Sequence, residues 1–211
     1  MEEVSKLRLL YTAANYIRTL PVYLSVLTSP HREIIEKDFN RWWKICSGMM
    51  DPISVKTRFK ALNWLLLYKP EYRSLLLHRF RRNPKTIASV IQFVVTRILW
   101  KPLESLYIET EDIGGGLFIQ HGFSTIICAE RIGENCWINQ QVTIGYNGQG
   151  DPPVIGDNVM ITCGAKVLGP IHVGDHVVVG ANAVVIRDVP DHCVVGGVPA
   201  KILKTTANHL Q

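Results

Sequence analysis

The stretch GGGLFIQHGFSTIICAERIGENCWINQQVTIGYNGQG, residues 114–150, decides the fold, because apolar β-branched residues recur in it at intervals of six. The same period continues through PVIGDNVMITCGAKVLGPIHVGDHVVVGANAVVIRDVP, residues 153–190. The recurring residues form two series, Ile126, Ile132, Ile138 and Ile144, then Ile155, Ile161, Val167, Val173, Val179 and Val185. Hexads of this kind are typical of a β-helix, in which each hexad is a short strand plus a corner and the branched residue points inward. We therefore predict about five coils of β-helix between residues 107 and 198.

Two interruptions break this period early in the β-helix. Ile119 and Ile126 are seven positions apart, so one residue is inserted beside His121. Ile144 and Ile155 are eleven positions apart, so five extra residues form a loop over 146–153. A regular repeat needs neither departure for stability, and such breaks tend to lie where function is. The two interruptions are therefore the first places to look for a site.

The part of the chain before the β-helix is predicted to be helical, which makes the fold class α+β with domains 1–103 and 104–211. Apolar residues at helical spacing indicate helices near 7–20, 31–46, 55–68, 71–80 and 84–100. Pro21 should kink or end the first of these. In the last, a stripe of Ile87, Ile91, Val94, Val95 and Ile98 favours packing against other helices over lying on a bilayer.

The charge of the chain limits the kinds of partner that it could bind. The net charge is +5, and between residues 69 and 101 eight basic residues face Glu71 alone: Lys69, Arg73, Arg79, Arg81, Arg82, Lys85, Arg97 and Lys101. This basic stretch is consistent with a solvated helix face, or with peripheral contact to acidic lipid headgroups or a charged glycan. Nucleic acid is disfavoured because no recognition motif accompanies the charge.

The N-terminus, the most apolar segment and the cysteines indicate the cellular location. The N-terminus MEEVSK lacks the basic and apolar regions of a secretory signal, and the most apolar segment, 87–100, is shorter than a membrane span. Five cysteines, odd in number and without a CxxC pair, are typical of free thiols in a reducing compartment. We expect a cytoplasmic protein, with membrane association left open.

The two repeat segments, together with VVGGVPAKIL at residues 194–203, resemble the serine O-acetyltransferase group of hexapeptide-repeat acyltransferases. The resemblance covers about residues 108–203. It implies a left-handed β-helix, a homotrimer that can pair into a dimer of trimers, and acetyl-CoA bound between neighbouring subunits.

His121 matches the catalytic histidine of that group in the pattern Phe-Ile-x-His-Gly. The reaction needs a base because a hydroxyl must lose its proton as it attacks a thioester, and imidazole suits that role near neutral pH. The alternative is a corner histidine that only hydrogen-bonds within its coil. A zinc site using His172, His176 and His192 is a second alternative, but no pattern brings convergent ligands together, so we predict no metal.

The acceptor side departs from the serine enzymes. Gln120 and Tyr107 stand where that group has aspartates, and Asp151-Pro152 stands where it has an Arg-His pair. Because a zwitterion needs complementary charges, we predict a sugar or polysaccharide hydroxyl as acceptor, bound by Gln120, Asn139, Tyr146 and Glu109. Serine itself, with Glu109 or Glu111 replacing the missing acid, is the alternative. A non-catalytic trimeric scaffold is the alternative from another class.

The cofactor side follows the group more closely. By the resemblance, Cys163, Ala165 and Ala183 line the pantetheine arm of acetyl-CoA, while Arg187 and Lys201 lie near its phosphates. A lysine point charge suits a phosphate. The alternative is that small residues at corners are simply what the repeat requires.

Overall fold

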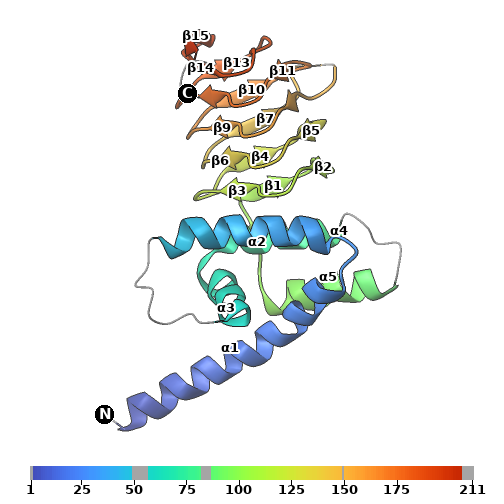
Figure 1. The fold of residues 1–211 in the computed structure, drawn as a ribbon, viewed down its shortest axis with the longest axis vertical. Helices are drawn as coiled ribbons and strands as arrows, with labels where there is room; N and C mark the ends of the chain where they lie inside the picture. The colour runs from blue at the N-terminus through green and yellow to red at the C-terminus, as the bar shows by residue number, and fades with distance from the viewer. Residues whose placement is uncertain (1, 49–56, 82–86, 149, 206–211) are drawn as a thin grey trace, which may run out of the picture. The chain divides into compact units, whose positions relative to one another are not determined.

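The computed structural model describes residues 2–48, 57–81, 87–148 and 150–205, and it divides into two compact units. The helical unit comprises Met1–Ile35 and Trp42–Pro102, and the β-helix unit comprises Glu36–Arg41 and Leu103–Gln211. A short piece of an early helix is therefore grouped with the β-helix, and this grouping was not predicted. Figure 1 traces both units along the chain.

Five helices are described in the first half of the chain. They are α1 (Glu2–Thr28), α2 (Arg32–Ser47), α3 (Arg58–Tyr68), α4 (Pro70–Arg81) and α5 (Ile87–Leu99). The predicted helical segments are confirmed, although residues 55–56 and 84–86 of the predicted third and fifth segments lie outside the described residues. Thr57 begins α3 as an N-cap whose side chain accepts a hydrogen bond from the Lys60 N–H.

The prediction that Pro21 ends the first helix is wrong, because α1 runs through it to Thr28. Proline removes one backbone hydrogen bond, but contacts with other helices hold α1 on either side of it. Thr19 donates from Oγ1 to Asn63 Oδ1 at 2.8 Å, and Trp100 donates from Nε1 to the Arg18 carbonyl oxygen at 3.2 Å. Tertiary packing thus outweighs the local preference.

The apolar stripe of α5 does not pack against other helices of this chain, contrary to the prediction. Ile91 is 56% exposed and Ile98 is 74% exposed, whereas Thr96 is buried. α1 shows the same inversion, with Leu10 and Ile17 exposed and Thr19 buried. Small polar residues therefore face the interior of the helical unit, and an apolar surface is left uncovered on both helices.

The basic stretch is only partly a solvated surface. Arg79 is fully buried, and partial burial lowers the pKa of the Arg73 guanidinium. Arg81, Arg97 and Lys101 are exposed. Arg82 and Lys85 lie outside the described residues.

The β-helix has three parallel sheets, which confirms the predicted fold class. The first sheet comprises β1 (Leu106–Ile108), β4 (Thr125–Ile127), β7 (Thr143–Gly145), β10 (Lys166–Leu168) and β13 (Val184–Val185). The second comprises β2 (Asp112–Ile113), β5 (Arg131–Ile132), β8 (Val154–Ile155) and β11 (His172–Val173). The third comprises β3 (Phe118–Ile119), β6 (Trp137–Ile138), β9 (Met160–Ile161), β12 (Val178–Val179), β14 (Cys193–Gly196) and the antiparallel β15 (Lys201–Thr205).

The inward series in the first sheet passes through Ile127 rather than the predicted Ile126. Ile127 is fully buried and pairs in register with Ile144, whereas Ile126 is 43% exposed. Because Thr125 and Ile127 share the inward face of a three-residue strand, Ile126 must face outward. Ile119 and Ile127 are eight positions apart, so the interruption beside His121 holds two extra residues rather than one.

At one corner, a series of aspartates links successive coils through hydrogen bonds. Oδ1 of Asp157 accepts a hydrogen bond from the Glu134 N–H at 2.7 Å, and Oδ1 of Asp175 accepts one from the Asp157 N–H at 2.7 Å. A Cβ atom at Gly133 would lie 2.2 Å from Asp157 Oδ1, so only glycine fits there. The glycine of the repeat thus makes room for a carboxylate.

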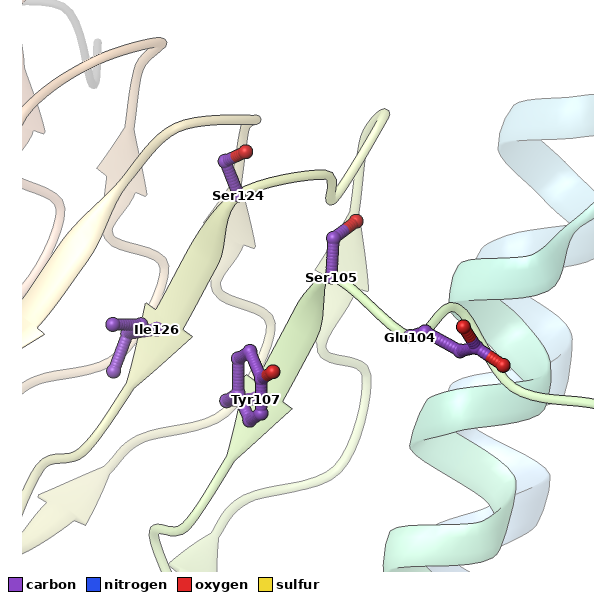
Figure 2. A pocket seen from close by; sticks show the side chains of 5 residues that line it. All are labelled: Glu104, Ser105, Tyr107, Ser124 and Ile126. Carbon is purple, nitrogen blue, oxygen red and sulfur yellow. The ribbon is translucent and has the colours of Figure 1, made fainter.

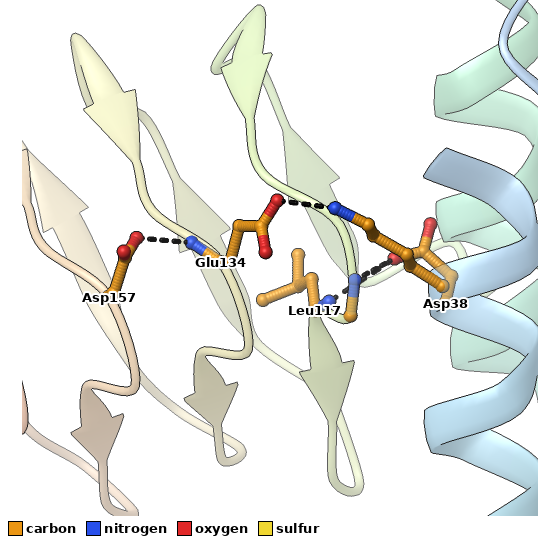
Figure 3. A network of polar contacts seen from close by, with 6 residues as sticks. Asp38, Leu117, Glu134 and Asp157 are labelled. Carbon is orange, nitrogen blue, oxygen red and sulfur yellow. Dashed lines mark hydrogen bonds and ion pairs between the residues drawn. The ribbon is translucent and has the colours of Figure 1, made fainter. Parts of the chain in front are cut away.

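The segment of α2 within the β-helix unit closes the first coil (Figure 3). Asp38, only 2% exposed, accepts hydrogen bonds at its Oδ1 from the N–H groups of Gly116, at 2.7 Å, and Leu117, at 3.2 Å. Lys37 donates from Nζ to Glu134 Oε1 at 2.7 Å. The first coil has no earlier coil whose carbonyl groups could accept from its N–H groups. The Asp38 carboxylate accepts from two of them instead.

Candidate active site

His121 lies in the two-residue insertion between β3 and β4. Its backbone has φ of +59°, and its carbonyl oxygen accepts a hydrogen bond from the Phe123 N–H, which closes a very tight turn. The following corner residue, Ser124, is also left-handed, with φ of +52°. The insertion therefore pushes the chain outward, and it leaves the imidazole exposed to solvent.

The corner that carries His121 continues up the β-helix as a single edge. Gln141 N–H donates to the Phe123 carbonyl oxygen at 3.0 Å, and Gly164 N–H donates to that of Gln140 at 3.1 Å. Asn182 N–H then donates to the Cys163 carbonyl oxygen at 2.9 Å. We call this edge, which joins the third sheet to the first, the His121 corner.

Several predicted site residues are collected at the His121 corner. Gln120 precedes His121 directly and donates its N–H to the Ile138 carbonyl oxygen at 2.9 Å. Asn139 lies on the next coil, where its Oδ1 accepts a hydrogen bond from Trp137 Nε1 at 2.7 Å. This bond orients the amide and uses one lone pair of its oxygen, so the NH₂ group and the second lone pair are left for another partner. Cys163 follows one coil later and is partly exposed.

Ala165 and Ala183 stand at the same edge, but both side chains are fully buried. Their methyl groups fill the interior of the β-helix. The neighbouring Gly164 is partly exposed and has φ of +73°. A Cβ atom there would lie 2.0 Å from Asn182 Oδ1, so both backbone shape and space require glycine.

Glu109, Tyr146 and Arg187 lie at the opposite corner, because each follows a strand of the first sheet. A three-residue strand separates the two corners by about 10 Å. The structure therefore splits the predicted site residues of one chain between two edges of the same sheet. Lys201 opens β15, next to Ala200, whose N–H donates to the Val184 carbonyl oxygen at 2.8 Å, so it lies near the far end of the first sheet.

Tyr146 is exposed. Its interaction with Cys128 raises the pKa of Tyr146, and desolvation and the Asp151 and Glu109 carboxylates act in the same direction. The phenol therefore stays protonated at neutral pH and offers a hydrogen-bond donor or acceptor rather than a base.

A hollow of about 450 Å³ lies on the outer face of the first sheet, beside the His121 corner. It is lined by Glu104, Ser105, Tyr107, Ser124 and Ile126. Ser105 and Ser124 lie on neighbouring strands, and Figure 2 shows their hydroxyls pointing to the same side. Ser124 follows His121 by three residues, so the hollow adjoins the histidine.

Sequence reasoning missed two charged residues near this hollow. Glu104 lines it, and Lys166 on β10 donates from Nζ to the Gln141 carbonyl oxygen at 2.7 Å. Neither occupies a position where the serine enzymes suggest a charge. The available signal was local: Glu104 immediately precedes the first strand, and Lys166 directly follows the corner residue Ala165.

The three histidines of the alternative zinc site do not converge. His176 and His192 stack with ring centroids 4.7 Å apart and planes at 6°, while His172 lies on β11. Among the described residues, no group of three or more His, Cys, Asp or Glu side chains is arranged to hold a metal ion. In the same part of the chain, no helix combines the length and apolar character needed to cross a membrane.

Comparison with known proteins gives a family match for part of this β-helix. Residues 152–187 match the family model described as bacterial transferase hexapeptide (six repeats). This match covers coils that carry Cys163, Lys166 and Ala183, and it agrees with the resemblance to hexapeptide-repeat acyltransferases over that part of the chain.

The individual relatives are more specific. A serine acetyltransferase of Synechococcus elongatus is 42% identical over 95 residues, which are 43% of this chain and 39% of that protein. One of Staphylococcus xylosus is 47% identical over 96 residues, which are 44% of each chain. The chain thus spans less than half the length of the curated relatives it matches.

Solved structures extend the likeness to the helices. Serine acetyltransferase of Neisseria gonorrhoeae, in complex with serine, has a TM-score of 0.59 and 25% identity over 87% of this chain and 73% of that one. The Brucella abortus enzyme in complex with coenzyme A has a TM-score of 0.57 over 88% of this chain and 73% of that one. At 24% identity, the second shows a common fold.

These comparisons contradict the predicted sugar or polysaccharide acceptor. The relatives and structural neighbours are named serine acetyltransferases, which was the stated alternative. The prediction set serine aside because the aligned positions lack charged partners for it, and it considered only Glu109 or Glu111 as a replacement for the missing acid.

Proposed function

We propose that the protein transfers the acetyl group of acetyl-CoA to the hydroxyl of serine. The single observation that carries this proposal is His121, exposed in an inserted turn beside a hollow lined in part by Ser105, Ser124 and Glu104. The serine acetyltransferase relatives support the choice of both substrates. The non-catalytic scaffold has no observation in its favour, since it needs neither the insertion nor the hollow.

In the proposed reaction, His121 removes the proton of the serine hydroxyl as its oxygen attacks the thioester carbonyl carbon. A C–O bond forms, and the carbonyl electrons move to its oxygen. When the tetrahedral intermediate collapses, the C–S bond breaks. The imidazolium then returns its proton to the sulfur, which gives O-acetylserine, free CoA thiol and a neutral histidine.

Acetyl-CoA is proposed to lie along the His121 corner. Cys163 and Gly164 form a narrow rung there, one coil above Gln140, and no bulky side chain occupies it. Lys201 lies farther along and suits a phosphate. Arg187 follows β13 at the opposite corner, so we propose that it reaches the phosphates of a cofactor held against a neighbouring copy.

A homotrimer would bring the two corners of the first sheet together in pairs. Within one chain they are about 10 Å apart, but the His121 corner of one copy facing the Tyr146 and Glu109 corner of another would make one continuous site. The exposed apolar residues of α1 and α5 would supply a second contact, as in a dimer of trimers. Light scattering after gel filtration tests this, and a monodisperse monomer contradicts it.

The acceptor can be tested directly. The purified protein is incubated with acetyl-CoA and L-serine, thiol release is followed with a chromogenic disulfide, and the product is identified by mass spectrometry. The proposal expects stoichiometric free CoA and O-acetylserine. Thiol release that is independent of serine, or none at all, contradicts it.

A further inference from the structure

Resting on the proposed function, we propose that Glu104 and Lys166 bind the two charges of the amino-acid acceptor, one on each side of His121. Glu104 would receive the ammonium group and Lys166 the carboxylate. The serine hydroxyl would then face the imidazole between them.

Backbone pairing places Glu104, His121 and Gln141 on three successive coils, and Lys166 lies on the fourth, in β10. Thr125 N–H donates to the Ser105 carbonyl oxygen at 3.1 Å, so Glu104 lies one coil before Phe123 in the stack. Gln141 N–H donates to the Phe123 carbonyl oxygen at 3.0 Å, which places Gln141 one coil after it. Lys166 is anchored to that third coil through the Gln141 carbonyl. His121, two residues before Phe123, belongs to the middle coil.

The spacing suits an α-amino acid. Neighbouring strands lie about 4.8 Å apart, so the two outer coils are separated by about 10 Å. An α-ammonium and an α-carboxylate share one carbon, and a charge-assisted hydrogen bond at each end brings the total span to roughly 9 Å. A molecule with both ends held in this way must direct its side chain at the middle coil, where His121 stands.

Both charged groups have capacity for a ligand. Within the described part of the chain, Glu104 forms no ion pair, and its side chain is exposed at the edge of the hollow. Figure 2 shows it beyond Ser105, at the end of the row of lining residues. Lys166 uses one of its three N–H donors on Gln141, which leaves two.

This pair also accounts for the departures noted in the sequence. Gln120, Tyr107 and Asp151-Pro152 carry no charge suited to a zwitterion at the aligned positions. Glu104 and Lys166 restore one negative and one positive group from different strands. The acceptor site therefore keeps its charge pattern while its residues change.

The test uses L-serine and L-serinamide, which keeps the ammonium and the hydroxyl but has no carboxylate. Glu104→Gln should raise KM for both acceptors by roughly 10- to 100-fold, the usual effect of losing a hydrogen bond to a charged group. Lys166→Met should raise KM for L-serine by a similar factor and leave KM for L-serinamide unchanged. Lys166→Arg and Glu104→Asp, which keep the charges, should retain more activity than the neutral variants.

Glu130→Gln and Lys204→Met are matched controls, because both residues are exposed on the β-helix unit and lie outside the hollow. Both should behave as the wild type, and thermal unfolding should show that all variants are folded. If the wild type acetylates L-serine and Glu104→Gln or Lys166→Met does so with unchanged KM, the pair is wrong and the proposed function stands. If the wild type does not acetylate L-serine, the proposed function and the pair are both overturned.

Discussion

Asp38 holds the first coil of the β-helix through a 2.7 Å hydrogen bond from the Gly116 N–H to its Oδ1 atom, made by a side chain that is almost wholly buried. The same carboxylate accepts from Leu117. We predict that Asp38→Ala lowers the free energy of unfolding by about 2–4 kcal/mol, since two buried N–H groups lose a charged acceptor. Chemical denaturation measures this.

The matched control is Asp112→Ala. Asp112 lies 3.6 Å from Arg131, and both side chains are more than half exposed, at 57% and 63%. A surface pair of this kind contributes less than about 1 kcal/mol. If both variants lost the same free energy of unfolding, the Asp38 contact would contribute no more than a surface ion pair, and the prediction would be wrong.

His121→Ala should reduce kcat with L-serine by about two or more orders of magnitude, as is usual when a general base is lost. Because the ring is exposed, the melting temperature should change little. His172→Ala serves as the control, since His172 is exposed on β11, away from the His121 corner. Wild-type turnover by a folded His121→Ala protein would remove the histidine from the mechanism.

Gly164→Ala should destabilise the protein by about 1–3 kcal/mol and raise KM for acetyl-CoA, because alanine is strained at φ of +73° and its Cβ would meet Asn182 Oδ1 at 2.0 Å. The double variant with Asn182→Gly should recover part of the stability, since it removes the clash but not the strain. Gly145→Ala, where nothing lies within 4 Å of the added atom, should be nearly neutral. Urea denaturation and steady-state kinetics measure both effects.

Stability should fall in alkali because of Cys136. Burial raises the pKa of this thiol to about 12 from its ordinary value of 9.0. Between these values the unfolded chain loses the proton while the folded chain keeps it, so the free energy of unfolding should fall by up to about 1.4 kcal/mol per pH unit. Below pH 9 both states hold the proton and the contribution of this group is constant.

Cys136→Ala should flatten that slope between pH 9 and 12, whereas Cys163→Ala, at a partly exposed site, should leave it in place. Denaturation at several pH values makes the comparison. An identical slope in the wild type and in Cys136→Ala would contradict the assignment.

The period of six was enough to predict most of the β-helix, because every strand needs a β-branched residue that points inward. It failed at Ile126 and Ile127, because Ile126 fits the period of six, whereas Ile127 is the residue that pairs with Ile144 and is buried. His121 could be found because it sits beside an interruption. The sequence alone could not show whether Glu109 and Tyr146 lie at the same corner as His121. A residue can be assigned to a corner only when the register of the strands is known.

The acceptor was mispredicted for a related reason. Charge was sought at positions fixed by alignment, but stacking brings Glu104 and Lys166 to the same edge although they are far apart in the sequence. The insertions change the number of residues per coil, so no constant spacing links these residues. Residues that become neighbours when coils stack cannot be identified from a sequence period that is interrupted between them.

The antiparallel strand β15 has a consequence for how copies of the chain can meet. A parallel stack with a bare last strand is a template on which another stack could grow end to end. Here β15 runs against β14 in the opposite direction, and Ala200 covers the end of β13. With Asp38 accepting from two N–H groups of the first coil, the described residues cover part of the backbone at both ends of the stack, which disfavours end-to-end growth.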